Sequence, residues 1–246
     1  MSCLLVTGRY QELLDLLALD RKSFWHYRCY GVEALLAMGR KSEALKYAEA
    51  SRGLNQRDST IDQACEEILI SSGLHDEAYR RYGLRAAQGN SYLARFRAVA
   101  KRYPMIAPED ILTDLIKTTP GEEGKWFATA KDLKLYDFAL QLADQSPCEP
   151  KTLNRAAKEF LETEPDFALG AAMAALRWLN EGWGYEVTSI DVIDAYELAL
   201  AAAERAQIDN VLDQIRTLLD QTEGAGNAFV RQSLSSGLHK SEVCKE

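Results

Sequence analysis

The amino-acid sequence predicts an all-α protein. Wherever an apolar pattern is clear, it has the three- and four-residue spacing of one helix face, as at Ile61, Cys65 and Ile68. Alternating runs of β-branched residues are missing, and the nearest candidate, residues 185–188, is too short to found a sheet. We expect about ten or eleven helices joined by short turns, and therefore antiparallel helix pairs.

Composition and charge narrow the class of protein. The chain has 246 residues, of which 47% are hydrophobic and 27% are charged, as in a folded protein. Its 37 acidic residues exceed its 29 basic residues, and the net charge of −8 argues against a generic nucleic-acid coat or a membrane-surface protein. No stretch approaches the roughly 20 apolar residues of a membrane span, and the five cysteines are scattered without a CxxC pair. We therefore expect a cytoplasmic protein with no metal, no cofactor and no membrane partner.

Two helix starts can be predicted from capping chemistry. In a capping box, a Thr oxygen accepts a hydrogen bond from the first helical turn, and an acidic side chain three residues later bonds back. Thr119 followed by Glu122, with Pro120 between them, fits this pattern, and so does Thr188 followed by Asp191. We expect helices to begin directly after Thr119 and Thr188.

A short motif recurs in the predicted turns. It consists of a glycine, two or three polar residues, an acidic residue and a small or apolar residue. The motif occurs in segments 8–13, 39–44 and 73–78, and a degenerate copy occurs in 134–139, while residues 209–212 resemble the end of a fifth copy. We expect Gly39 and Gly73 to be structural turns that end one helix with positive φ, with the acidic residue in the first turn of the next helix.

The spacing of these turns resembles the tetratricopeptide family. Gly39 and Gly73 are 34 residues apart, which is the period of that family. The resemblance extends to the small residue five positions after each glycine, Ala44 and Ala78. It implies a tetratricopeptide-like α-solenoid of helical repeats in the N-terminal third. Arg28 stands where the family has its Trp, so no peptide-carboxylate site is carried over.

The positions of the prolines indicate the domain organisation. All six lie between residues 104 and 165, so the composition changes near residue 103. We expect tetratricopeptide-like helical repeats over residues 1–103 and a helical continuation of the solenoid, or a second helical lobe, over residues 104–237. Residues 238–246 are expected to form a flexible tail.

A second resemblance covers much of the remaining chain. Segments 92–98, 101–104, 119–128 and 182–186 are similar to an uncharacterised family of bacterial helical proteins of unknown function. The resemblance implies a helical-repeat fold and a bacterial source. That family has no established activity, so it supplies no functional residues.

The clearest local feature of the sequence is a basic segment. No acidic residue occurs from Ala78 to Pro108, whereas seven cations do: Arg80, Arg81, Arg85, Arg95, Arg97, Lys101 and Arg102. Aromatic residues are interleaved with them, a mixture that suits nucleic acid, but Tyr92, Phe96 and Tyr103 share one helix stripe typical of a core. Three interpretations follow: a face that is solvated or complementary to the acidic residues 144–223, a site for a protein or acidic peptide, or a nucleic-acid site.

A loop with two aromatic residues is a second candidate site. Trp183 and Tyr185 lie between glycines in residues 180–186. Large aromatic side chains are unfavourable to leave exposed in a loop. They are expected either to fold back over the alanine-rich helix at residues 168–179 or to edge a ligand groove.

The main functional hypothesis is a non-enzymatic protein-interaction module or scaffold that presents a helical groove, because stacked helix pairs create an extended surface and no catalytic set is recognisable. The candidate partner-binding residues are Arg80, Arg81, Arg95, Arg97, Lys101, Arg102, Trp183 and Tyr185. The alternatives are a nucleic-acid-associated protein that uses residues 80–102, and an all-α enzyme whose site is not recognisable from sequence. The expected partner is a protein or peptide, and self-association is a further alternative.

Overall fold

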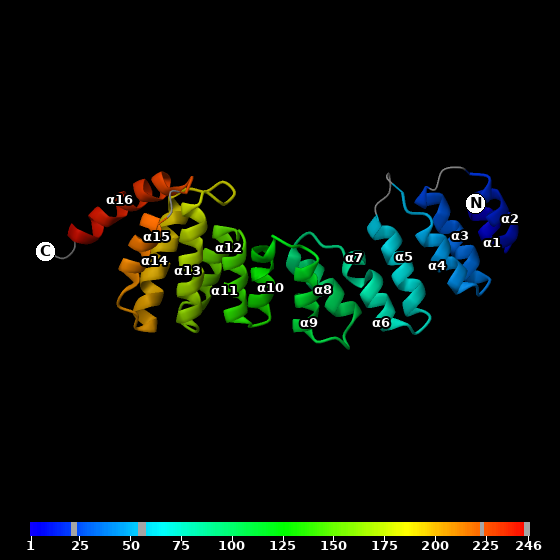
Figure 1. The fold of residues 1–246 in the computed structure, drawn as a ribbon, viewed down its shortest axis with the longest axis horizontal. Coiled ribbons are helices and arrows are strands. Elements are labelled where there is room, and N and C mark those ends of the chain that lie inside the picture. The colour runs from blue at the N-terminus through cyan, green and yellow to red at the C-terminus, as the bar shows by residue number, and fades with distance from the viewer. Residues whose placement is uncertain (21–23, 54–57, 222–223, 244–246) are drawn as a thin grey trace. The chain divides into compact units, whose positions relative to one another are not determined.

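The regular elements of the structure are helical. A computed structural model describes residues 1–20, 24–53, 58–221 and 224–243, and no strand occurs among them. The prediction of an all-α protein is confirmed. The chain divides into two compact units, Met1–Leu115 and Ile116–Glu246, each of which is described by itself (Figure 1). The boundary between them falls later than the one expected near residue 103.

The first unit consists of short and medium helices. Its elements are α1 (Ser2–Val6), α2 (Tyr10–Ala18), α3 (Trp25–Ala37), α4 (Lys41–Glu49), α5 (Asp58–Ile70), α6 (His75–Ala78), a π-helical turn (Tyr79–Gly83), α7 (Leu84–Ala86), α8 (Tyr92–Arg102) and α9 (Pro108–Lys117), which crosses the unit boundary. Helix α3 packs against both α2 and α4, and α5 packs against α4 and residues 75–86. At the N-terminal end, Leu13, Leu17 and Ala34 are fully buried.

The second unit contains the longest helices of the chain. Its elements are a 3-10 turn (Glu123–Trp126), α10 (Phe127–Asp132), α11 (Tyr136–Gln145), α12 (Pro150–Phe160), α13 (Pro165–Asn180), α14 (Ser189–Ala206), α15 (Val211–Gln221) and α16 (Asn227–Val243). Helix α16 thus extends into the segment expected to be a tail, and residues 244–246 of that segment lie outside the described residues. The described residues form more segments than the ten or eleven helices predicted, because residues 75–86 and 123–132 are divided into short pieces.

Helices of the second unit contact both the next helix and the one after it. Helix α13 packs against α11 and α15, and it also packs against α12 and α14, which contact each other. Helices α11, α13 and α15 therefore form one layer, and α12 and α14 lie in another (Figure 1). Close packing is possible because α13 is rich in buried alanines, such as Ala168, Ala171 and Ala175, which add little volume between helix axes.

The recurring motif corresponds to a recurring backbone turn. Gly39 and Gly73 have φ values of 74° and 77°, in the left-handed region expected for them, and Gly8 has a φ of 72°. The Gly39 N–H donates to the Leu36 carbonyl (2.9 Å), and the next N–H, of Arg40, donates to the carbonyl five residues back (2.8 Å). This pair of bonds is the Schellman arrangement, which satisfies carbonyls that the helix leaves free.

The degenerate copies of the motif adopt the same turn without glycine. Lys134 and Gln207 have φ values of 61° and 57°, and each is followed by a residue whose N–H donates to the carbonyl five residues back. After the turns at residues 8, 39, 73 and 134, the next helix begins two residues later. The fourth residue of that helix is fully buried in each case, as at Ala44 and Ala139. The turn therefore fixes which face of the following helix enters the core.

One of the two predicted helix starts is confirmed and the other is wrong. Thr188 and Asp191 form a complete capping box at the start of α14. Thr119 does not cap a helix. Its hydroxyl accepts a hydrogen bond from the Trp126 indole (2.8 Å), and the helical backbone begins later, at Glu123. A fully buried indole N–H needs a partner, and this need outweighs the local capping preference.

The turns predict opposite stability changes at two matched positions. No atom lies within 4 Å of a Cβ added at Gly73, so Gly73→Ala introduces only the left-handed penalty and should lower the free energy of unfolding by about 1 kcal/mol. Lys134→Gly removes the same penalty and should raise stability by about 0.5 to 1 kcal/mol. Urea denaturation of both variants measures the two shifts. Shifts of the same sign would show that backbone strain does not govern these turns.

Candidate functional site

The basic segment is joined to acidic residues of its own unit. Arg81 forms ion pairs with Glu49 of α4 (2.6 Å) and Glu77 of α6 (2.7 Å). Arg85 lies 3.5 Å from a carboxylate oxygen of Asp62 on α5. These partners are contributed by α4, α5 and α6, whereas the sequence suggested the acidic residues 144–223 as the complementary charge.

Two of the carboxylates in this network are buried. Asp62 is 2% exposed and bonds to Arg52 (2.5 Å), and Glu66 is 6% exposed and accepts a hydrogen bond from the Tyr103 hydroxyl (2.6 Å). Arg102 approaches Glu66 at 3.7 Å. A buried carboxylate without such partners would be strongly destabilising, so these contacts are required by the fold.

The interleaved aromatic residues are part of the same core. Tyr79 donates to Asp114 (3.1 Å), packs edge-on against Tyr103, and lies near Tyr82, whose hydroxyl donates to Glu49. Burial raises the pKa of all three tyrosines, and hydrogen bonds to carboxylates raise it further. The core stripe predicted for Phe96 and Tyr103 is present, since both are buried. These rings are therefore not available to stack on bases.

The remaining basic candidates differ in how far they are exposed. Arg95 is half-buried and donates to the Leu84 carbonyl (2.7 Å), and burial lowers its pKa. Arg80, Arg97 and Lys101 are exposed. The segment thus combines a structural network with an exposed basic surface, to which Arg81, Arg85 and Arg102 also contribute.

The aromatic loop leaves both rings in solvent. Trp183 is 53% exposed and Tyr185 is 74% exposed, so neither side chain is buried over α13, and the alternative that they edge a ligand groove stays a prediction. The loop backbone is held instead against the start of α12: the Tyr185 N–H donates to Glu149 (3.3 Å), and Lys151 donates to the Glu186 carbonyl (2.8 Å). These contacts fix the loop without burying its aromatic side chains.

A cleft between α12 and α14 brings together residues that the sequence analysis did not select. Its volume is about 720 Å³, within the range of ligand sites. Helix α12 lines it with cations and α14 lines it with carboxylates; the charged members are Lys151, Arg155, Lys158, Asp191, Asp194 and Glu197. Each set repeats every three or four residues, so each lies on one face of its helix. Oppositely charged stripes on two helices that pack together are the sequence signal for this site.

The ends of the cleft are closed by interactions between its two sides. At one end, Lys151 lies 4.0 Å from Asp191. Beyond the other end, Arg205 of α14 forms an ion pair with Glu162 (2.5 Å). Between these pairs, no described contact joins Arg155 or Lys158 to a carboxylate across the cleft. The central charges therefore face an open space.

An amide group on the wall of the cleft has unused hydrogen-bonding capacity. Asn154 is 7% exposed, and its Nδ2 donates to the Asp191 carbonyl (2.8 Å). Its Oδ1 is buried and accepts no hydrogen bond from the described residues, and one of the two Nδ2 hydrogens is likewise unused. This oxygen is covered by the protein and is not open to a ligand in the cleft, and it is one of several such buried atoms among the described residues.

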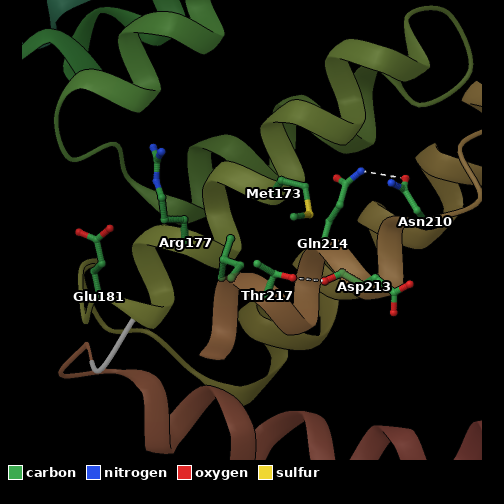
Figure 2. Close-up of a pocket in the computed structure, with 8 residues that line it drawn as sticks. Met173, Arg177, Glu181, Asn210, Asp213, Gln214 and Thr217 are labelled. Atoms are coloured by element: carbon green, nitrogen blue, oxygen red, sulfur yellow. Dashed lines mark hydrogen bonds between the residues drawn. The ribbon is translucent and has the colours of Figure 1, made fainter. Parts of the chain in front are cut away.

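A second hollow, of about 490 Å³, lies between α13 and α15 (Figure 2). Several of its polar groups are engaged: Arg177 bonds to Asp144 and to the Ala143 carbonyl, both at 2.8 Å, while Gln214 donates to Asn210 (2.9 Å) and the Thr217 hydroxyl donates to the Asp213 carbonyl (2.7 Å). The buried Arg177 Nε has no hydrogen-bond partner among the described residues. The cleft between α12 and α14 has the larger volume and more charged side chains on its walls.

Comparisons with known proteins identify no relative. No family model matches the chain, and no curated protein or solved structure matches it at a significant level. The functional argument therefore rests on the structure and the sequence alone. Among the described helices, none is long and apolar enough to cross a membrane.

The buried Glu66 predicts a pH-dependent effect of its substitution. Burial raises the pKa of Glu66 above its ordinary value, so the folded state holds the proton more tightly than the unfolded state. The stability gained from this proton is present at low pH and is lost as pH rises through the raised pKa. Glu66→Gln keeps an acceptor for Tyr103 but cannot ionise, so the free energy of unfolding of the variant minus that of the parent should increase from about pH 4 to about pH 7.

Urea denaturation of parent and variant across this pH range measures the difference, and groups common to both proteins cancel. A difference that stays constant, or that decreases with pH, would contradict a raised pKa of Glu66 caused by burial.

Proposed function

We propose that this chain is a protein-interaction module of the tetratricopeptide-like helical-repeat type, whose cleft between α12 and α14 binds an extended polypeptide segment. The recurring turns, and the packing of α12 on both α13 and α14, support a stack of helix pairs, an architecture that creates extended binding surfaces. The single observation that carries the proposal is the bounded cleft, whose central charges on α12 and α14 make no ion pair with each other in the described part of the chain.

The length of the cleft fits a short extended chain. Helices α12 and α14 are in direct contact, and residues of both line the cleft. On α14 the residues that line the cleft run from Asp191 to Ala201, a length of about 15 Å at 1.5 Å per helical residue. An extended segment of about five residues has this length at about 3.3 Å per residue.

The hydrogen-bonding groups also suit a polypeptide. A peptide bond offers one N–H donor and one carbonyl acceptor, and the walls of the cleft carry acceptors on Asp194 and Glu197 and donors on Arg155 and Lys158. The cleft carries as many carboxylates as cations, so it has no excess positive charge to attract a nucleic acid. In the basic segment, Arg81, Arg85 and Arg102 are already close to carboxylates. These observations favour a polypeptide partner over a nucleic acid.

Filling the cleft should abolish peptide binding. Ala201 lines the cleft and is half-buried, so Ala201→Trp places an indole in the space where a ligand would lie. Random linear peptides displayed on phage are selected on the full chain, and the affinities of enriched peptides are measured by fluorescence polarisation. We expect micromolar binding to the parent and a loss of about tenfold or more in the variant, equivalent to about 1.4 kcal/mol.

Ala228→Trp, at an exposed position of α16, adds the same side chain outside the cleft and should leave affinity unchanged. The proposal fails if no peptide is enriched on the parent. It also fails if the enriched peptides bind the Ala201→Trp variant as tightly as the parent.

A further inference from the structure

The α12 wall of the cleft carries cations and the α14 wall carries carboxylates. We infer that the cleft selects a segment whose acidic side chains face α12 and whose basic side chains face α14. This inference rests on the proposed function and adds the chemistry of the partner. It concerns the sidedness of charge along the bound segment, which is separate from the segment's net charge. A peptide with the same composition but with mixed sides would be a poorer ligand.

The register of the two walls is visible at one end of the cleft. Lys151 lies 4.0 Å from Asp191, and Asn154 donates to the carbonyl of that same residue. Further along the two helices, residues three or four positions apart lie on the same face. Arg155 and Lys158 therefore lie on the α12 wall, and Asp194 and Glu197 lie on the α14 wall. Lys158, Asp194 and Glu197 make no side-chain hydrogen bond or ion pair with the described residues, and Arg155 bonds within its own helix.

An extended chain matches this arrangement. Successive side chains of a strand point to opposite sides, and side chains on one side are about 6.6 Å apart. Along α12, the steps from Lys151 to Arg155 and from Arg155 to Lys158 are about 6 and 4.5 Å. Alternating acidic and basic side chains would thus meet the complementary wall at each position, at a distance that flexible Lys and Glu side chains can adjust.

Electrostatic complementarity here serves specificity more than affinity. Exposed ion pairs are individually weak, and two or three of them together amount to about tenfold in the dissociation constant. Like charges placed against each other oppose binding, so a segment with mixed sides loses the attraction and gains repulsion. The contrast between two peptides of identical composition is therefore the quantity to measure.

The test uses two eight-residue peptides, (Glu-Lys)4 and (Glu-Glu-Lys-Lys)2, with the full-length chain. In an extended conformation the first has one acidic and one basic side, whereas the second has both charges on each side. We expect (Glu-Lys)4 to bind about tenfold more tightly at low salt, with the difference reduced as salt increases. Isothermal titration calorimetry gives both dissociation constants.

Charge exchange between the walls provides a matched set of variants. Arg155→Glu with Lys158→Glu makes the centre of the cleft acidic, and Asp194→Lys with Glu197→Lys makes it basic, so each pair should abolish the preference for (Glu-Lys)4. All four changes together restore one wall of each sign and leave the net charge of the chain unchanged. Because a one-residue shift exchanges the two sides of the alternating peptide, the fourfold variant should recover its preference. The four side chains are exposed, so the variants are expected to fold, and circular dichroism checks this.

Recovery in the fourfold variant supports the inference, since simple damage to the cleft would accumulate with each change. Equal affinity of the parent for the two peptides overturns the inference, and so does a fourfold variant no better than the two half-exchanged variants. In both of those cases, the proposed function stands if peptides from the phage library still bind the parent more tightly than the Ala201→Trp variant. Absence of binding by any peptide, selected or designed, defeats both proposals.

Discussion

Reversal of the chain through a left-handed residue is the constraint on which the arrangement of helices depends. The end of a helix leaves carbonyl groups without partners, and at Gly39, Gly73 and Lys134 the same two N–H groups satisfy them. One positive φ and two hydrogen bonds fix the direction in which the next helix starts, and the residue five positions after the turn is buried each time. The same pair of bonds recurs at Gly182 after α13, whereas none of the described residues between α12 and α13 has positive φ. Helices α12 and α14 lie side by side because both pack on α13. The cleft between them is a consequence of that stacking.

Local chemistry was sufficient to predict the helical class, the turns and the start of α14. Glycine at residues 39 and 73 and the capping pair Thr188 and Asp191 each act within a few residues, so their effects can be seen in the sequence. Thr119 shows where such reasoning fails. Its hydroxyl accepts a hydrogen bond from the buried indole of Trp126, and the turn that carries this ring packs on α10 and α11, so its burial follows from tertiary packing.

The candidate sites show the same division between local and distant effects. The charge of residues 80–102 is evident from composition, but the carboxylates that pair with Arg81 and Arg85 come from α4 and α5, and their proximity follows only from folding. The cleft was missed for the same reason. In the sequence, Arg155 and Asp194 each look like an ordinary exposed helix residue. They can be recognised as parts of one cleft only when α12 and α14 are known to pack together. Stripes of opposite charge on two helices are a signal that can be searched for once a stacked helical fold is predicted.

The position of a bound peptide tests whether the cleft between α12 and α14 is the binding site. Methyl-labelled Ala201 and Leu198 lie on the cleft, whereas Leu140 and Leu218 lie near the layer of α11, α13 and α15. Nuclear magnetic resonance of the full chain during titration with a phage-selected peptide reports which methyl groups sense the ligand. The account predicts saturable chemical-shift changes at Ala201 and Leu198, with those of Leu140 and Leu218 unchanged. Changes confined to Leu140 and Leu218 would place the ligand in the hollow beside α15 and contradict the account.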